Sequence, residues 1–171
     1  GSNVAVILNQ TTFYGESGGQ EGDHGIISIE GGGEIDITGT IKKLGDLHVH
    51  LGIVSKGKLC IGNNVYLEVE HQRRADLRVH HSATHLLHQA LRDVLGEHVL
   101  QKGSLVDDKH LRFDFSHPQP ITEIDLGKIE NIANKIIKQN DKVNISIVPY
   151  KKALEMGAMA LFGEKYEDEV R

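Results

Sequence analysis

The stretch His80-His81-Ser82-Ala83-Thr84-His85-Leu86-Leu87-His88-Gln89-Ala90-Leu91-Arg92-Asp93-Val94-Leu95-Gly96 dominates the sequence. Its apolar residues recur at the i, i+3, i+4 and i+7 spacing of one buried helix face, and Gly96 suits a helix end. They are Ala83, Leu86, Leu87, Ala90, Leu91, Val94 and Leu95. A polar stripe on the opposite face holds His81, His85, His88 and Arg92. The pattern predicts an amphipathic helix with a histidine-rich outer face.

His81 and His85 are four residues apart, so on a helix their imidazoles lie one above the other. Such a pair can supply two of the four ligands of a tetrahedral zinc ion. The commoner explanation is a solvated helix face that happens to be rich in histidine. The only cysteine, Cys60, lies in an alternating run where a small buried thiol is expected, so it does not complete a site. The residues alone leave both interpretations open.

Composition indicates an ordinary globular protein. A chain of 171 residues can form one good core or two small ones, and 39% of its residues are hydrophobic. No apolar run approaches a membrane span and no signal peptide is recognisable, so we expect neither a membrane protein nor a secreted one. A single cysteine gives no disulfide framework, which fits a cytoplasmic location. Gly1-Ser2 resembles the remnant of a cleaved tag.

The net charge of −5 argues against nucleic-acid binding by bulk electrostatics. Residues 1–70 hold 4 Lys and Arg against 9 Asp and Glu, whereas residues 71–171 hold 15 of each. Any RNA contact would therefore be local. The first candidates are Arg73, Arg74, Arg78 and Arg92, for which helix solvation and ion pairing are the alternative.

The first seventy residues predict a β domain. Residues 4–8 form a short apolar run fit for a buried strand, and a glycine-rich loop follows from Thr11 to Gly25. This loop lacks the lysine and the spacing of a P-loop, which excludes a nucleoside triphosphate site there. The sequence then alternates with period two, predicting strands at 26–29, 34–41, 47–54 and 65–69. Closely spaced short strands favour a small glycine-rich β-barrel.

Beyond residue 71 the composition becomes charged and helical, so we place a domain boundary there, between 1–70 and 71–171. The His-rich helix precedes a hairpin of residues 99–106 and 111–115 that turns at Asp107-Asp108. A second helix starts at Thr122, with an N-cap hydroxyl, and reaches about Asn140. Expected last are a strand at 143–148, a short helix at 151–156 and a lead-out through 158–163. The predicted class is α+β, a barrel followed by helices packed on an antiparallel sheet.

Several motifs together resemble the editing domain of bacterial alanyl-tRNA synthetases, and more distantly the free-standing alanyl-tRNA editing proteins. The likeness runs in order over nearly the whole chain. The matching motifs are Thr12-Phe13-Tyr14 with Glu16-Ser17-Gly18-Gly19-Gln20, His81-Ser82-Ala83-Thr84-His85-Leu86-Leu87-His88, Gln101-Lys102-Gly103-Ser104-Leu105-Val106, Leu111-Arg112-Phe113-Asp114-Phe115-Ser116-His117, and Gly157-Ala158-Met159-Ala160-Leu161-Phe162-Gly163-Glu164-Lys165-Tyr166.

The resemblance implies a domain of an ATP-dependent alanine–tRNA ligase that hydrolyses alanine tRNA wrongly charged with serine or glycine. It implies that His81 and His85 bind zinc, completed by a cysteine and a histidine from a later Cys-Gly-Gly-Thr-His segment. Gln101 would line the aminoacyl pocket, Thr84 is a weaker pocket candidate, and the loop of Gly18, Gly19 and Gln20 would modulate activity. The implied partners are the tRNA acceptor end and other domains of the parent enzyme.

The sequence departs from this family at one decisive point, because it ends before the Cys-Gly-Gly-Thr-His segment. Two imidazoles without a thiolate hold zinc weakly, so we expect this chain to bind zinc weakly and to be a poor hydrolase. Two alternatives stay open: a shortened free-standing enzyme that edits in trans, and a noncatalytic module that docks the tRNA acceptor end. Editing domains of threonyl-tRNA synthetases also carry such a histidine helix, but the glycine-rich loop argues against that identity.

Overall fold

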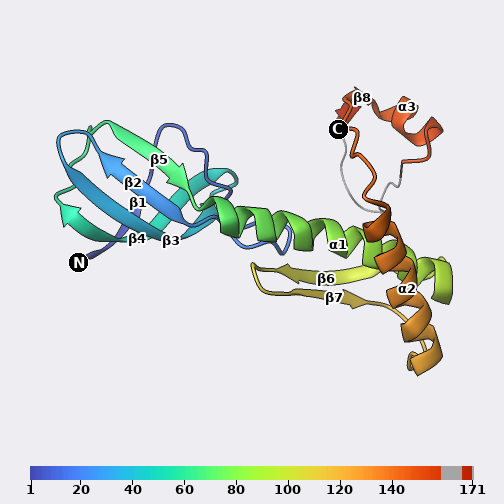
Figure 1. The fold of residues 1–171 in the computed structure, drawn as a ribbon. Helices are drawn as coiled ribbons and strands as arrows, with labels where there is room; N and C mark the ends of the chain where they lie inside the picture. Colours follow the sequence, from blue (N-terminus) through green and yellow to red (C-terminus); the bar gives the residue numbers. More distant parts are fainter. Residues whose placement is uncertain (159–166, 171) are drawn as a thin grey trace. The chain divides into compact units, whose positions relative to one another are not determined.

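The computed structural model describes residues 1–158 and 167–170 (Figure 1). Two compact units divide the chain, Gly1–Lys135 and Ile136–Arg171. The mixture of helices with antiparallel sheets agrees with the predicted mixed class. The domain boundary near residue 71 stays a prediction. None of the helices in the described ranges is long and apolar enough to cross a membrane.

The first unit begins with a five-stranded antiparallel sheet in the order β1-β4-β3-β2-β5. The strands are β1 (Asn3–Val6), β2 (Gly25–Ile29), β3 (Gly33–Lys43), β4 (Leu47–Gly57) and β5 (Val65–Val69). They form because apolar and polar residues alternate, so one face of each strand can be buried. Strands are found at all five predicted places, but the first covers Asn3–Val6 instead of 4–8 with only Val6 buried, and β3 and β4 are longer than the sequence indicated.

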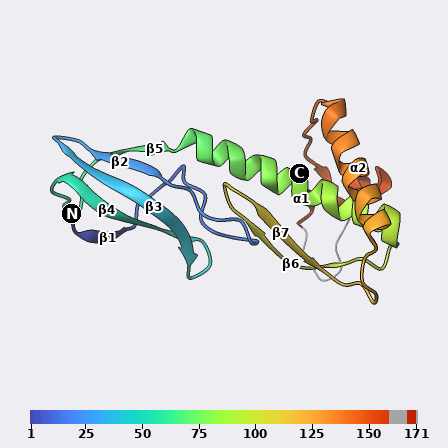
Figure 2. The same cartoon turned by 60° about the horizontal axis from the view of Figure 1, so that its bottom comes forward.

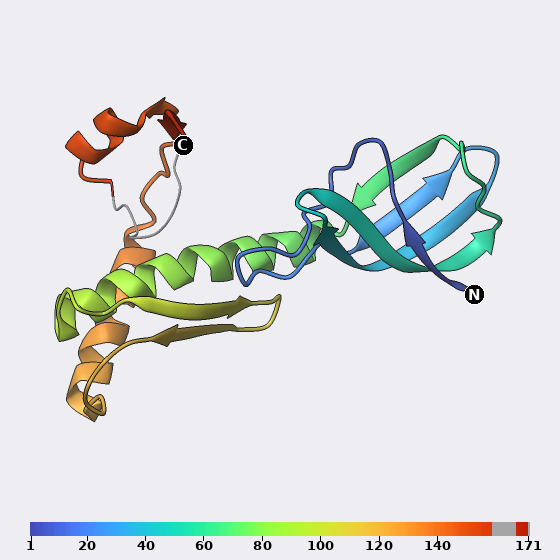
Figure 3. The same ribbon diagram turned by 180° about the vertical axis from the view of Figure 1, so that it is seen from behind.

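One face of this sheet encloses a core. Its buried members come from four of the five strands and from the glycine-rich loop, and the strands curl around them (Figure 3). They are Val6, Phe13, Ile27, Ile29, Ile35, Ile37 and Val69. The expected closed barrel is not found. Closure would need hydrogen bonds between β1 and β5, and these two strands instead form the two edges of the sheet.

The long helix α1 (His71–Leu95) follows β5 directly. It begins at His71, nine residues before His80, and the Glu70 amide just before it still donates to the His24 carbonyl. It ends at Gly96, whose φ of 115° suits glycine and whose amide donates to the Arg92 carbonyl at 2.9 Å. The predicted stop is confirmed.

A hairpin of β6 (Gln101–Val106) and β7 (Leu111–Phe115) runs alongside α1 (Figure 2). The helix α2 (Glu123–Gln139) then begins as predicted, where the Asp125 amide donates to the Thr122 hydroxyl at 3.2 Å. α1, α2 and the segment leading into β6 share a second core of Ala90, Leu91, Val99 and Ile129. The described part of this unit therefore has two separate hydrophobic clusters.

The second unit contains β8 (Val148–Pro149), α3 (Tyr150–Glu155) and β9 (Glu169–Val170). The predicted strand at 143–148 is wrong, because only its last residue is in a strand. Val143, Ile145 and Ile147 are 81%, 63% and 69% exposed, so their alternating pattern has no surface to pack against. The lead-out predicted for residues 158–163 lies, apart from its first residue, outside the described residues.

Two side chains in the first seventy residues have environments that local sequence does not reveal. Cys60 is exposed, contrary to the prediction of a buried thiol, because it lies in the turn after β4 rather than in a strand. His50 is fully buried and donates from Nδ1 to the Val6 carbonyl, while its Nε2 accepts from the Thr11 hydroxyl at 2.7 Å. Burial lowers the pKa of His50, so the ring is neutral.

Candidate functional site

His81 and His85 lie side by side on an exposed face of α1, with ring centroids 5.1 Å apart. His81 Nδ1 is 2.7 Å from Oε1 of Gln20, which belongs to the glycine-rich loop. An amide oxygen only accepts, so Nδ1 carries the proton and the lone pair of a neutral His81 is on Nε2. The contact therefore orients the ring and selects its tautomer.

The His85 ring is biased towards its neutral form. Partial burial lowers its pKa, and the neighbouring His81 and His88 lower it further. A neutral imidazole is the form that binds a metal ion. The two histidines thus offer nitrogen lone pairs on one face of one helix.

The polar stripe predicted along α1 is divided in the structure. His88 does not share the exposed face, because it is only 6% exposed, with its ring against Phe113 and Nε2 donating to the Val99 carbonyl at 3.3 Å. The segment leading into β6 and the β7 strand cover this part of the helix. Arg92 similarly donates to the carbonyls of Glu97 and Val99. The histidine face is therefore limited to His81 and His85.

The two predicted pocket residues have different surroundings. Thr84 is buried, and its hydroxyl donates to the His80 carbonyl one turn earlier. Gln101 is exposed at the start of β6, opposite Phe115. The roles of both residues in a pocket stay predictions.

Two hydrogen bonds fix α1 along the hairpin. His80 Nδ1 donates to the Asp107 carbonyl at 2.7 Å at the hairpin turn, and His88 bonds Val99 before β6. These anchors make α1 antiparallel to β6. Gln101 lies between the two anchors on the strand side, as His81 and His85 do on the helix side.

The glycine-rich loop adds an extended segment to the free edge of β6. The Val106 amide donates to the Gly19 carbonyl at 2.8 Å, and the Glu21 amide donates to the Val106 carbonyl at 3.0 Å. Gly19 has a φ of 83°, and a Cβ there would lie 2.3 Å from the Ser104 carbonyl oxygen. Glycine is therefore required at this position for the loop to approach β6 closely enough to present Gln20 to His81.

Two arginines at the start of α1 hold the other end of this loop. Arg73, only 7% exposed, donates to the Gly22 carbonyl at 2.9 Å and pairs with Glu21. Arg74 pairs with the buried carboxylate of Asp23. These two arginines follow the ion-pairing interpretation rather than the RNA one. Asp23 was not among the residues predicted from sequence, although an acidic residue in a glycine-rich loop and two adjacent arginines are visible signals of an ion pair.

The zinc site expected at His81 and His85 stays a prediction. Among the described residues, no group of three or more His, Cys, Asp or Glu side chains is arranged to hold a metal ion. His81 and His85 fit two corners of a tetrahedral shell in ligand type, helical spacing and tautomer. Further ligands would have to come from outside the described residues.

Comparison with known proteins relates the chain to aminoacyl-tRNA synthetases. Residues 1–73, which include the five-stranded sheet and the glycine-rich loop, match the family model for class II (A) tRNA synthetases. Over all 171 residues the chain is 54% identical to the alanine–tRNA ligase of Bradyrhizobium diazoefficiens, 58% to that of Granulibacter bethesdensis and 57% to that of a Chelativorans species. Over its full length the chain is therefore homologous to a segment of the alanine–tRNA ligases. The matches include the whole of this chain but only 19% of the length of each relative.

Proposed function

We propose that this chain forms part of the editing site of an alanine–tRNA ligase, which hydrolyses the ester of alanine tRNA mischarged with serine or glycine. One observation supports this most directly: the paired rings of His81 and His85 on an open helix face, with Gln20 fixing one of them. The proposal includes the acceptor end of the tRNA and the remaining domains of the ligase as partners, and a cytoplasmic location.

The chain's own residues would position the metal and the substrate. His81 through Nε2 and His85 through its neutral ring would hold a zinc ion, which when bound polarises a carbonyl and acidifies water. Gln20 keeps His81 in the metal-binding tautomer, as outer hydrogen-bond partners of metal-binding histidines do. The loop that carries Gln20 is in turn held by β6 and by Arg73.

Selectivity poses a separate physical problem. Alanine is intermediate in size between glycine and serine, so bulk alone cannot admit serine and refuse alanine. A site that hydrogen-bonds the serine hydroxyl can do so, because alanine leaves the polar group of the site unpaired. We assign this contact to Gln101, whose amide is exposed beside α1.

The test uses the full-length ligase and tRNA(Ala) charged with serine. Replacing His81 and His85 together by alanine is expected to slow deacylation by more than about 100-fold, since losing even a hydrogen-bond partner of a metal ligand costs about 10–100-fold. The matched control is His71→Ala, an exposed histidine on the same helix. Zinc content by elemental analysis should fall in the double variant and stay unchanged in the control. Undiminished deacylation in the double variant would refute the proposal.

The second function we propose is noncatalytic docking of the tRNA acceptor end, which would not need a complete set of metal ligands. The 171-residue chain is expected to leave serine-charged tRNA(Ala) intact while the full-length protein hydrolyses it. Rapid hydrolysis by the isolated chain, with stoichiometric zinc after dialysis, would favour the free-standing trans-editing alternative.

A further inference from the structure

The two edges of the N-terminal sheet run in the same direction. Each neighbouring pair in the order β1-β4-β3-β2-β5 is antiparallel, so β1, β3 and β5 point one way while β4 and β2 point the other. Both edges nevertheless cover the same core, to which β1 contributes Val6 and β5 contributes Val69. The curl of the sheet thus places the parallel edge strands β1 and β5 over the same core, although no hydrogen bonds join them.

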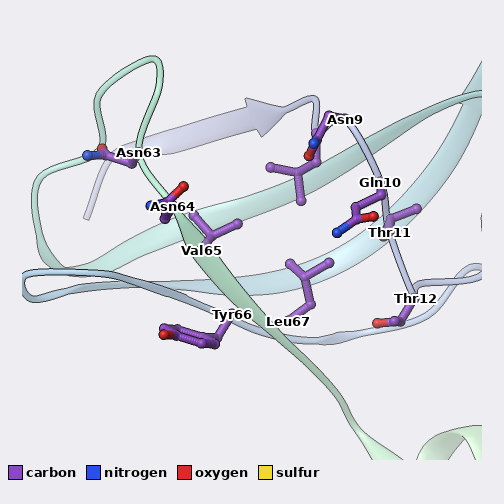
Figure 4. Close-up of a pocket in the computed structure, with 10 residues that line it drawn as sticks. Asn9, Gln10, Thr11, Thr12, Asn63, Asn64, Val65, Tyr66 and Leu67 are labelled. Carbon is purple, nitrogen blue, oxygen red and sulfur yellow. The ribbon is translucent and has the colours of Figure 1, made fainter.

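The space between these edges, called the seam here, is hollow. A cavity of about 560 Å³ lies between residues 8–12 and residues 63–67. A second cavity of about 280 Å³ extends along β1, lined by residues 5–8, residues 59–63 and Val65. Figure 4 shows Val65 and Leu67 on the opposite side of β5 from Tyr66, with Gln10 and Thr11 across the opening. Leu8, Leu59, Val65 and Leu67 are only partly buried members of the core.

Backbone amides point into the seam from both edges. On β5, the carbonyl of Asn64 accepts from Glu30 and the amide of Glu70 donates to His24. Antiparallel pairing alternates, so the even-numbered residues of β5 bond to β2 while the amides of Val65 and Leu67 point outwards. On β1, the Ser2 carbonyl accepts from Val54, so by the same alternation the Ala5 amide points outwards.

We propose that one extended strand of the same longer polypeptide lies in the seam, antiparallel to both β1 and β5. An all-antiparallel sheet can close on itself only with an even number of strands, and the present sheet has five. One added strand of this direction gives six and pairs both edges. The chain spans 19% of its relatives, so in those proteins ample polypeptide lies outside the matched segment and can supply such a strand.

The chemistry of the seam favours a peptide strand over a nucleic acid. Its larger cavity is lined by amide, hydroxyl and apolar side chains, with no charged residue among them. A peptide strand can place alternate apolar side chains on Leu8, Val65 and Leu67 while its backbone pairs with the edges. The acidic excess of residues 1–70, with 4 Lys and Arg against 9 Asp and Glu, disfavours a phosphate backbone. An unpaired edge is also an aggregation liability that proteins commonly cover.

Hydrogen exchange with residue resolution tests this inference, by comparing the 171-residue chain with the full-length gene product. The outward amides of Ala5, Val65 and Leu67 are expected to exchange at least about tenfold more slowly in the full-length protein, because they gain hydrogen-bond partners. The amides of Tyr66 and Glu68, which point towards β2, should be protected in both proteins and serve as internal controls.

Two variants of the full-length protein sharpen the comparison. Leu67→Lys places a charge on the floor of the seam and should abolish the added protection at Val65, whereas Glu68→Lys on the exposed face should preserve it. Protection of the Tyr66 amide reports whether the sheet still folds in the Leu67→Lys variant. If that variant does not fold, the comparison of the two wild-type proteins alone tests the inference. Equal exchange at Val65 in both wild-type proteins would overturn the inference. Protection that instead appears in the short chain as its concentration rises would assign the seam to a second copy.

Discussion

Replacing Asp23 by alanine is expected to destabilise the first unit strongly. Asp23 is 2% exposed, and its carboxylate accepts from the Tyr14 amide at 2.6 Å and from the Arg74 guanidinium. Its backbone carbonyl accepts from the Thr40 hydroxyl at 2.9 Å. One residue thereby joins the glycine-rich loop, α1 and β3.

The magnitude follows from the burial of the two charges. Removing one partner of a buried ion pair costs about 3–5 kcal/mol, since the other charge is left without compensation. The Arg74 side chain is 34% exposed, so water can solvate its charge once Asp23 is removed. We therefore expect a loss at the lower end of this range, about 3 kcal/mol. For a protein of this size that corresponds to a fall in Tm of about 6–12 °C. Asp23→Asn keeps an acceptor for the Tyr14 amide and should cost about 1–2 kcal/mol.

The assay is urea unfolding followed by circular dichroism, with the midpoint and slope compared between variants. The matched control is Asp46→Asn, because Asp46 also pairs with a cation, Lys42, but is 90% exposed and should leave the midpoint unchanged. The reasoning is refuted if Asp23→Ala lies within about 1 kcal/mol of the wild type, well below the cost of a broken buried pair.

Three further predictions concern the first unit. Gly19→Ala should break the pairing with β6 and speed exchange of the Glu21 amide, while Gly31→Ala, with positive φ but open space, should not. Burial lowers the pKa of His50 in the folded protein, so as pH falls the unfolded chain takes up the proton at a higher pH than the folded one. The free energy of unfolding should therefore decrease as pH drops through and below 6.5. Equal urea midpoints at about pH 7.5 and about pH 5.5 would contradict this. Cys60 should react with a thiol reagent in the native protein as rapidly as in urea.

Local patterns predicted most of the elements. Alternation located the five strands, the spacing of Leu87, Leu91 and their neighbours located α1, and Thr122 and Gly96 marked helix ends. The pattern at 143–148 failed because its apolar residues stay exposed, and alternation alone does not supply a surface to pack against.

The candidate site was predictable only in part. The spacing of His81 and His85 is a local property of one helix, so their juxtaposition followed directly. The contact of Gln20 with His81 joins residues 61 positions apart, and it depends on the loop pairing with β6. The ion pairing of Arg73 and Arg74 with the loop likewise needs the sheet to be placed beside the start of α1.

Periodicity and spacing were sufficient for the type and order of the elements and for the histidine pair, because those properties depend on neighbours a few residues away in the chain. The burial of His88, the exposure of Cys60 and the open seam between β1 and β5 were decided by tertiary structure. Whether a side chain or a strand edge meets solvent depends on which distant segment covers it, and no local pattern encodes that.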